Sequence, residues 1–471
     1  MPPSYREALN LITTEARHSA SISPSTEKIH VYHALNRISE HTQRSPQPTP
    51  RFDTSAMDGY ALNSAATKTA SPESPIVFCV KGIIAAGDEP VSVSGEPETE
   101  LRDGLGAIYP CVEIMTGARF PETIGGSRAF DCCVKVEDVE ILGVEKRVAM
   151  MGGNSYIKVM KPAQFQQNRR LAGNDFGKDD VIVDVGEVIR PRHIMALASV
   201  GLNEVPVVRR PRIGAFSTGS ELLDPDTQRS SLQRIQDANG PYIMTNLEDY
   251  GADVEFLGVL DDGADTITRA LEYSVHENKY DMIISTGGVS TGRFDLVPAA
   301  LQRLGARIVF HKIDIRPGHP VLFAKIPRRE ATQTEKSEVA FFGMPGNPVA
   351  SAACLRFLVV PYLQHLWSEE PESPLQATAR RNQHEKIEVE ANGSTRNGSN
   401  ETLLSRFPVE KDVFRPGFFY RHSSNELSVI IINDYSPGKI KPFLASNCWI
   451  HIPEGQSELH EGAIVDIIPN D

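Results

Sequence analysis

The chain has 471 residues, of which 40% are hydrophobic and 23% charged, a composition typical of a folded globular protein. This length exceeds what one ordinary hydrophobic core accommodates, so roughly two to four domains are expected. The formal net charge of −13 argues against non-specific binding to nucleic acid or to an anionic membrane surface, and an anionic ligand would need a local basic pocket.

Neither the cysteines nor the N-terminal residues indicate export. The six cysteines show no C-x-x-C spacing and no metal-ligand pattern, which favours a reducing compartment. Residues 1–25 hold no apolar run fit for a signal peptide, and no later segment is interpreted as a membrane span. We therefore expect a cytoplasmic protein.

The first sixty residues predict a helix and then an extended arm. Apolar residues recur at helical spacing within residues 4–20. Prolines then alternate through 45–50 and force an extended backbone, because each fixes φ and restricts the residue before it. This arm leads to Asp58, which could present a carboxylate at a cleft, although an Asp-Gly pair taken by itself is more often a turn or a helix cap.

Residues 76–165 predict a mostly β domain, because short β-rich runs are separated by glycines. The next segment, 164–175, carries two adjacent arginines and ends in Asp175. Without further context, a cluster of this kind is a solvated charged face.

After Pro211 the pattern changes to alternating strands and helices, which is typical of an open α/β sheet. Small or acidic residues follow several of the predicted strands. These are Thr218 and Glu221, Asp261 and Asp262, the stretch from Thr286 to Asp295, and the turn of Pro345, Gly346 and Asn347. In a parallel sheet such strand ends lie along one edge, where ligands usually bind. The sequence therefore predicts a ligand site at this edge.

The stretch 280–298 carries the strongest signal for this site. A short apolar strand runs into residues 285–292, which hold three glycines and four hydroxyl side chains, and a helical pattern restarts after Asp295. Backbone N–H groups of such a loop can approach an anion closely. A strand, a glycine loop and a helix in this order form the usual phosphate-binding corner of an α/β sheet, and the alternative is a tight turn without a ligand.

Eight motifs, taken together and in this order, resemble the molybdopterin molybdenumtransferase family, which includes the bacterial MoeA proteins, plant and fungal E domains and the gephyrin E domain. They are Ser55–Ala61, Met115–Ala118, Arg169 and Arg170 with Gly173 and Asp175, Ser217–Leu222, Asp237–Asn239, Ser285–Gly292 with Asp295, Arg316–Pro320 and Pro345–Val349. The motifs span nearly the whole chain.

The resemblance implies a multidomain protein of α/β and β parts. The expected parts are a helical and extended linking domain (1–25 and 166–207), a β-rich domain (26–165), a doubly wound, mostly parallel, MogA-like α/β domain that binds molybdopterin (208–372), and a small C-terminal β-barrel domain (373–471). It also implies a homodimer whose site lies between the α/β domain of one subunit and the β-rich domain of the other.

The implied reaction cleaves adenylylated molybdopterin, inserts molybdate into its dithiolene and releases AMP, with Mg²⁺ required. The resemblance implies an upstream molybdopterin adenylyltransferase as a partner, and no nucleic acid or membrane. Carboxylates suit a hard cation that bridges phosphates, and the expected Mg²⁺ ligands are Asp58, Glu221, Asp262 and Asp295. The expected catalytic residues are these four with Asp175 and Lys312.

The residues expected to bind the substrate are small, hydroxyl-bearing or basic. They are Thr116, Gly117, Thr218, Gly219, Thr286, Gly287, Gly288, Ser290, Gly292, Arg316, His319, Pro345, Gly346 and Asn347. The glycine loop would bind the phosphate or the pterin end through its N–H groups. Arg316, His319 and Lys312 would receive the molybdate dianion and offset charge in the transition state.

This sequence departs from the family pattern at three places. Arg316 and His319 stand where the family usually has lysines, and histidine is only partly charged at neutral pH. Ala350 replaces a serine, and residues 438–442 lack the Gly-x-Gln-x-Ser pattern. Two alternatives therefore stay open: a divergent enzyme for another adenylylated or phosphorylated substrate, and a non-catalytic scaffold of the same fold.

Overall fold

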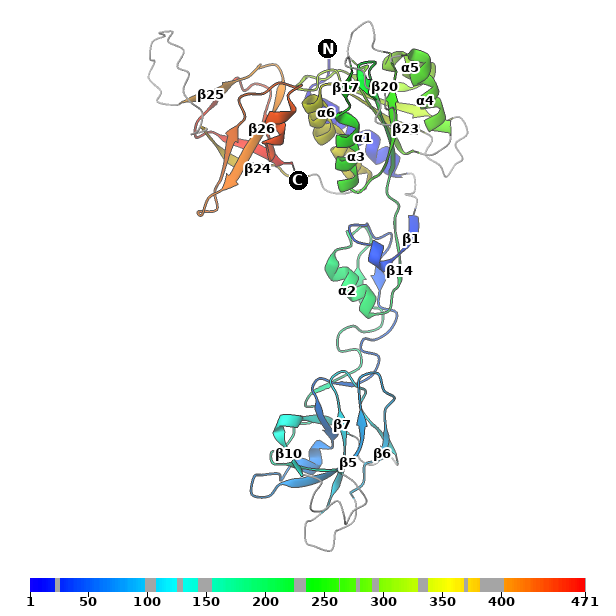
Figure 1. Ribbon diagram of the computed structural model, residues 1–471, viewed down its shortest axis with the longest axis vertical. Helices are drawn as coiled ribbons and strands as arrows, with labels where there is room; N and C mark the ends of the chain where they lie inside the picture. The colour runs from blue at the N-terminus through cyan, green and yellow to red at the C-terminus, as the bar shows by residue number, and fades with distance from the viewer. Residues whose placement is uncertain are drawn as a thin grey trace. The chain divides into compact units, whose positions relative to one another are not determined.

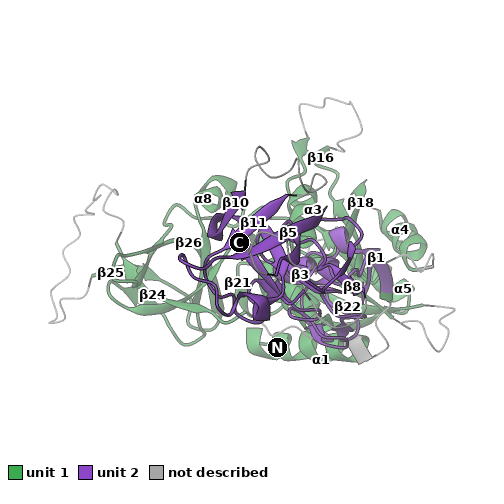
Figure 2. Ribbon diagram, turned by 90° about the horizontal axis from the view of Figure 1, so that it is seen from below, with its two compact units in different colours: residues 1–26, 208–471 green, residues 27–207 purple. Residues whose placement is uncertain are grey.

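The computed structural model describes residues 1–21, 26–97, 107–124, 130–142, 155–223, 234–261, 263–276, 280–289, 296–328, 338–367, 372–381 and 402–470. The chain forms two compact units (Figure 2). The first combines Met1–Thr26 with Val208–Asp471, and the second is Glu27–Val207. The finer division into four domains stays a prediction.

A six-stranded sheet forms the centre of the first unit, in the order β18-β15-β19-β23-β22-β20. The strands are β18 (Asp253–Leu260), β15 (Arg212–Thr218), β19 (Met282–Thr286), β23 (Glu338–Met344), β22 (Leu322–Pro327) and β20 (Arg307–His311). The first four are parallel neighbours, and β22 runs antiparallel to both of its neighbours. This confirms the predicted mostly parallel sheet.

Helices cover both faces of this sheet (Figure 1). On one face lie α1 (Tyr5–Ser21), α3 (Asn239–Asp249) and a long helix after β23; on the other lie α4 (Ala264–His276) and α5 (Val297–Arg303). The strand β19 contributes side chains to the cores on both faces of the sheet. Met282 and Ile284 belong to the first core and Ile283 to the second, because successive side chains of a strand point to opposite faces. The doubly wound prediction is confirmed.

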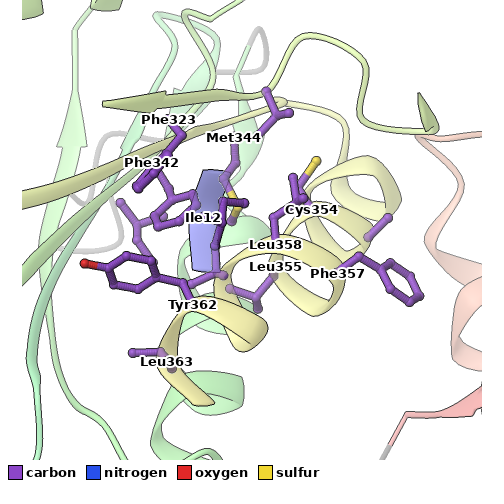
Figure 3. Packing of buried hydrophobic residues seen from close by; sticks show 14 of the residues in the cluster. Ile12, Phe323, Phe342, Met344, Cys354, Leu355, Phe357, Leu358, Tyr362 and Leu363 are labelled. Carbon is purple, nitrogen blue, oxygen red and sulfur yellow. The ribbon is translucent and has the colours of Figure 1, made fainter. Parts of the chain in front are cut away.

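The long helix after β23 is continuous through α6 (Pro348–Cys354), a π-helical turn (Leu355–Val359) and α7 (Val360–Leu366). Figure 3 shows Leu358 and Tyr362 of this helix beside Ile12 of α1 and the sheet residue Phe342. By length and composition, Pro348–Leu366 could cross a membrane, which the sequence did not predict. Its apolar window is 83% buried inside the fold, and a core helix passes the same test.

A five-stranded barrel follows in the C-terminal part of the first unit. Its strands are β26 (Asp412–Arg421), β27 (Leu427–Ile431), β24 (Leu375–Arg380), β30 (Ile464–Pro469) and β28 (Cys448–Ile452), and pairing of β28 with β26 closes it. The short strand β21 (Ile315–Arg316) joins β26 from the α/β part. Phe414 and Trp449 of the barrel are buried in the core that also contains α1 and α6. The predicted small barrel is confirmed.

The second unit is mostly β, as predicted. Its main sheet has the order β10-β11-β5-β7-β4-β9. These strands are β10 (Val139–Leu142), β11 (Tyr156–Val159), β5 (Ile76–Ile84), β7 (Tyr109–Ile114), β4 (Gly59–Leu62) and β9 (Cys132–Lys135). The helix α2 (Pro191–Ser199) packs in a separate small core.

Short elements complete the described structure. Two-stranded pairs are β1 (Thr26–His30) with β14 (Glu204–Val208), β2 (Gln43–Arg44) with β13 (Val181–Val183), β3 (Thr54–Ser55) with β12 (Arg169–Arg170), β6 (Ser92–Ser94) with β8 (Glu122–Ile124), β16 (Leu222–Leu223) with β17 (Ile235–Gln236), and β25 (Leu403–Arg406) with β29 (Glu458–His460). Helical turns are η1 (Val31–His33), η2 (Ser64–Thr67), η3 (Val136–Asp138) and α8 (Ile440–Leu444).

Lys325 on β22 is a charged residue inside the main core, with 1% of its surface exposed. Its Nζ lies 2.9 Å from Ser19 Oγ of α1 and 3.4 Å from the Tyr362 hydroxyl of α7. Burial lowers the pKa of Lys325, although Glu338 and Glu15 oppose this. Burial of the charged amine therefore costs stability at neutral pH.

We predict that Lys325→Met stabilises the protein at pH 7, by roughly 1–4 kcal/mol, because a buried charge gives way to an apolar side chain of similar length. Ser19 and Tyr362 lie 3.3 Å apart and can still bond to each other. The folded pKa lies below the unfolded one, so the cost is full below the folded pKa and shrinks as pH rises toward about 10.4.

Thermal unfolding at pH 7 and near pH 10 measures this effect, with Lys325→Arg as the control that keeps a charge. The gain in stability of Lys325→Met over the wild type should be smaller at the higher pH. A variant that is less stable than the wild type at pH 7 would mean that the two hydrogen bonds of the amine outweigh its burial.

Candidate active site

A pocket of about 620 Å³ opens where the parallel strands end, and we call it the strand-end pocket. Its lining comes from the ends of β15 and β19, the turn after β23, the start of α3 and the C-terminal residues Gly438 and Ile440. The described residues that line it are Thr218, Gly219, Glu221, Leu222, Ile235, Gln236, Asp237, Ala238, Asn239, Thr286, Gly287, Gly288, Gly346, Asn347, Pro348, Gly438 and Ile440. This is the sheet edge where open α/β folds bind ligands.

Gly287 allows two strand ends to approach closely. Its φ of +83° lies in the left-handed region, and a Cβ at this position would lie 2.4 Å from the Thr218 carbonyl oxygen. Its N–H donates to the Met344 carbonyl over 2.9 Å, and the Gly219 N–H donates to the Leu260 carbonyl over 3.3 Å. These two N–H groups are therefore already hydrogen-bonded within the sheet edge. The close approach of the two strands is the reason that glycine is needed at position 287.

A chain of hydrogen bonds crosses the floor of the strand-end pocket. Ser217 Oγ donates to Asp237 Oδ2 over 2.7 Å, and Thr286 Oγ1 lies 3.2 Å from Ser217 Oγ. Thr218 Oγ1 donates to the Thr286 carbonyl over 3.0 Å. Asp237 thus bonds directly to the hydroxyl at the end of β15 and, through Ser217, is linked to the Thr286 hydroxyl at the end of β19.

Asp237 also begins α3. Its Oδ1 accepts the N–H groups of Asn239 and Gly240 at 3.0 and 3.2 Å, so the carboxylate satisfies N–H groups at the start of the helix. Asn239 Nδ2 donates to the Gly346 carbonyl over 2.9 Å. The Asp237–Asn239 motif therefore ties α3 to the turn after β23.

A second pocket of about 380 Å³ is formed where the α/β part meets the barrel, and we call it the basic pocket. Arg316, His319 and Lys411 line it, together with Glu410 as the acidic residue, and Asn347 lines both pockets. His319 Nδ1 donates to the Ile313 carbonyl over 2.6 Å, since a carbonyl oxygen can only accept. The Asp314 carboxylate lies 3.8 Å from His319 Nδ1 and 3.5 Å from Lys411 Nζ.

Arg415 adds positive charge near the basic pocket, and Tyr435 packs against it. The Arg415 guanidinium lies over the Tyr435 ring, 4.5 Å from its centroid. Burial lowers the pKa of Arg415, and the neighbouring charge of Arg316 lowers it further. Burial raises the pKa of Tyr435, so the phenol stays neutral. Two guanidinium groups are thus held close enough to influence each other.

The structure brings many of the predicted residues to the two pockets. Thr218, Gly219, Glu221, Thr286, Gly287, Gly288, Gly346 and Asn347 line the strand-end pocket, and Arg316, His319, Pro345 and Asn347 line the basic pocket. Lys312 is not among the lining residues of either; its backbone has a φ of +73° and its N–H donates to the Val321 carbonyl over 2.8 Å. Asp262, Ser290, Gly292 and Asp295 lie outside the described residues.

Four predicted site residues belong to the second unit, and their contribution to one site with the pockets stays a prediction. Asp58 Oδ1 accepts the Thr116 N–H at 2.6 Å and the Thr116 hydroxyl at 2.8 Å, and these bonds lower the pKa of Asp58. Gly117 takes a φ of +82° in the same turn. Asp175 forms an ion pair with Arg170.

Binding of Mg²⁺ at the strand-end pocket would depend on its carboxylates. Among the described residues there is no group of three or more His, Cys, Asp or Glu that could hold a metal ion. A Mg²⁺ ion that binds substrate phosphates needs only one or two protein carboxylates. Glu221 is exposed at the strand-end pocket, whereas Asp237 already accepts three hydrogen bonds. Glu221 therefore fits this mode of binding.

Asp237 and Lys411 are among the pocket residues that were not predicted as site residues. Asp237 belongs to a motif that the sequence singled out, but an Asp before a helix is ordinarily a cap. Lys411 carries no local signal, since it lies almost a hundred residues beyond Arg316 in the chain. The parallel pairing of β21 with β26, with Ile315 opposite Asp412, brings the two together.

Sequence models of two families match most of the chain. Residues 3–201 match the MoeA N-terminal region (domain I and II), and residues 214–365 match a probable molybdopterin binding domain. The molybdopterin molybdenumtransferase of Synechococcus elongatus is 27% identical over 468 residues, covering 98% of each chain. That of Staphylococcus aureus (strain COL) is 30% identical over 369 residues, covering 78% of this chain and 76% of the relative.

Solved structures show the same fold. A crystal structure of the molybdopterin biosynthesis MoeA protein from Pyrococcus horikoshii superposes with a TM-score of 0.71 at 24% identity, covering 100% of this chain and 99% of the other. A second crystal structure of a molybdopterin biosynthesis MoeA protein, from Pyrococcus horikoshii OT3, gives a TM-score of 0.64 at 23% identity, covering 99% of each chain.

We predict that Gly287→Ala destabilises the protein by at least roughly 1–3 kcal/mol, the usual cost of a non-glycine residue in the left-handed region. Contact with the Thr218 carbonyl would add to this cost. Gly346→Ala is the matched control, because its Cβ would meet nothing closer than Gly287 Cα at 3.7 Å and its φ lies outside that region. Urea unfolding measures both variants, and equal stability would contradict the close approach of the strand ends.

Proposed function

This chain belongs to the molybdopterin molybdenumtransferase family, and we propose that it inserts molybdate into the dithiolene of adenylylated molybdopterin and releases AMP. The observation that carries this proposal is the pair of neighbouring pockets that share Asn347. One pocket is large enough for an organic substrate, within the range of about 300–1,000 Å³ for ligand sites. The other is lined by cationic side chains suited to an oxyanion.

In the proposed mechanism, molybdate is a substrate that enters the basic pocket. Arg316 offers a planar fork of N–H donors, and Lys411 offers a point charge. Arg415 behind them strengthens the positive potential, and His319 adds charge when its Nε2 is protonated. These groups hold the dianion beside the organic substrate and reduce the effective charge on the reacting oxygens.

Within the same proposal, Glu221 would hold Mg²⁺ at the strand-end pocket, and Asp58, Asp262 and Asp295 remain the other proposed ligands. Bound Mg²⁺ supplies neutralisation of phosphoanhydride charge. Asp175 and Lys312 remain proposed catalytic residues. The placement of Arg316 and Lys411 in the basic pocket supports these two as the main cationic groups for molybdate.

We also propose that the protein is a cytoplasmic homodimer that receives its substrate from a molybdopterin adenylyltransferase. The family membership supports this assembly, in which Asp58 and the pockets would come from different subunits. Sedimentation equilibrium would measure the mass of the assembly, and a monomer at working concentration would overturn the proposal.

Reconstitution tests the reaction. Purified protein is mixed with adenylylated molybdopterin, Mg²⁺ and molybdate, and AMP release and cofactor formation are measured separately. Both products are expected from the wild type. AMP without cofactor would indicate loss of metal insertion. The absence of both products would favour a scaffold or another substrate.

Arg316→Ala should raise the molybdate concentration for half-maximal cofactor formation by about tenfold or more, since it removes a charged hydrogen-bonding group.

Arg406→Ala is the matched control for this variant. Arg406 is an exposed residue of β25 that is paired with Glu458, and it lines neither pocket. Its removal should leave the molybdate dependence unchanged. An equal effect of both substitutions would exclude a specific role for Arg316.

His319 should make molybdate binding depend on pH. Molybdate binding is expected to tighten as the pH falls from about 8 to about 6, because a protonated imidazole attracts a dianion more strongly than a neutral one. Protonation at Nε2 adds a positive charge beside Arg316 and Lys411, with Asp314 and Glu410 as the nearby acids. His319→Lys should flatten the dependence. Calorimetric titration at several pH values measures it, and a wild-type profile that is flat would remove His319 from the site.

A further inference from the structure

The strand-end pocket has an acidic lining, unlike the basic pocket beside it. Of the described residues that line it, Glu221 and Asp237 are acidic and none is Lys, Arg or His. In the basic pocket the described lining includes Arg316, Lys411 and His319 against one acid, Glu410. An anionic group that is not neutralised by a bound cation would therefore be repelled from the strand-end pocket and attracted to the basic pocket.

The hydrogen bonds on the floor of the strand-end pocket have a fixed direction. A carboxylate can only accept, so the Ser217 hydroxyl donates its single proton to Asp237. Ser217 must then accept a hydrogen bond from Thr286, so the hydroxyl proton of Thr286 is also used within the protein. Thr218 donates its proton to a carbonyl oxygen. Both threonine hydroxyls can therefore offer a ligand only lone pairs.

Several donors near the floor are also engaged within the protein. The N–H groups of Gly219 and Gly287 donate to the carbonyls of Leu260 and Met344. Asn239 Nδ2 donates to the Gly346 carbonyl. The floor thus combines oriented acceptors with donors that are already satisfied, which suits a ligand edge that carries N–H groups.

We infer that the strand-end pocket recognises the aminopyrimidine edge of the pterin through the acceptor hydroxyls of Thr218 and Thr286, the second of which is oriented by Asp237 through Ser217. This inference rests on the proposed function, which supplies the pterin, and it assigns an orientation to the substrate. The 2-amino group and the adjacent ring N–H meet the acceptor floor. The anionic end extends past Asn347 toward the basic pocket.

The same hydrogen bonds make Asp237 a positioning residue for Thr286. In Asp237→Asn, the side-chain carbonyl can still accept from Asn239 and Gly240, while the new amide donates to Ser217. The Ser217 proton is then released toward Thr286, and the Thr286 proton is released toward the pocket. This one substitution would convert Thr286 from an acceptor into a donor without removing any atom from the pocket wall.

Pterin and lumazine test the inference, because lumazine carries a 2-oxo acceptor where pterin carries the 2-amino donor. Both are fluorescent, so their affinities for the full-length protein can be measured by direct titration. The wild type should bind pterin about tenfold or more tightly than lumazine, the effect of exchanging one matched hydrogen bond for an unmatched pair. Asp237→Asn should reduce this preference to about one or reverse it.

Thr286→Val and Thr286→Ser provide a matched pair of variants. Valine removes the acceptor and should abolish most of the preference, whereas serine keeps the hydroxyl and should retain it. Thermal unfolding of each variant establishes that it folds. Equal wild-type affinity for the two ligands, no binding of either at millimolar concentration, or an unchanged preference in folded Asp237→Asn would each overturn the inference.

Cofactor formation by the same wild-type preparation separates this inference from the proposed function. A preparation that forms cofactor without preferring pterin would contradict the orientation and leave the function intact. A preparation that prefers pterin but forms neither AMP nor cofactor would contradict the function and support the acceptor floor.

Discussion

The seating of the C-terminal barrel on the α/β part is the constraint on which both pockets depend. The barrel residues Phe414 and Trp449 are buried in the main core of the first unit. There Phe357 stacks on Phe414, with ring centroids 3.9 Å apart. The pairing of β21 with β26 continues this contact at the level of the backbone. As a result, Lys411 reaches the basic pocket, and Gly438 and Ile440 complete the strand-end pocket.

Because the two adjacent pockets carry opposite charge, the site favours one orientation of its substrate. Asn347 marks the boundary, because it follows β23 and lines both sides. A substrate with a donor-bearing ring at one end and anionic groups at the other would meet complementary surfaces only in one orientation. The chain has a net charge of −13, so its overall field does not attract an oxyanion, and the local group of Arg316, Lys411 and Arg415 must do so.

The sequence predicted the parts of this site that depend on local pattern. Hydroxyl and glycine residues after short apolar strands indicated the sheet edge, and Thr218, Thr286 and Gly287 lie there as expected. The expected role of the loop amides could not be judged from pattern, because the Gly287 N–H is engaged by Met344, a partner 57 residues away in the chain. Lys411 was missed for the same reason, since its position depends on a long-range strand pairing. Asp237 belongs to one of the motifs recognised in the sequence, but its hydrogen bond with Ser217 forms only in the folded chain.

Diffraction from crystals soaked with molybdate and pterin together would show whether the two pockets divide the substrates by charge, with molybdenum located by its anomalous scattering. We expect molybdenum beside Arg316, His319 and Lys411, and the pterin amino edge against the hydroxyls of Thr218 and Thr286. Molybdenum located among Glu221 and Asp237, or both ligands in one pocket, would contradict the division of the site by charge.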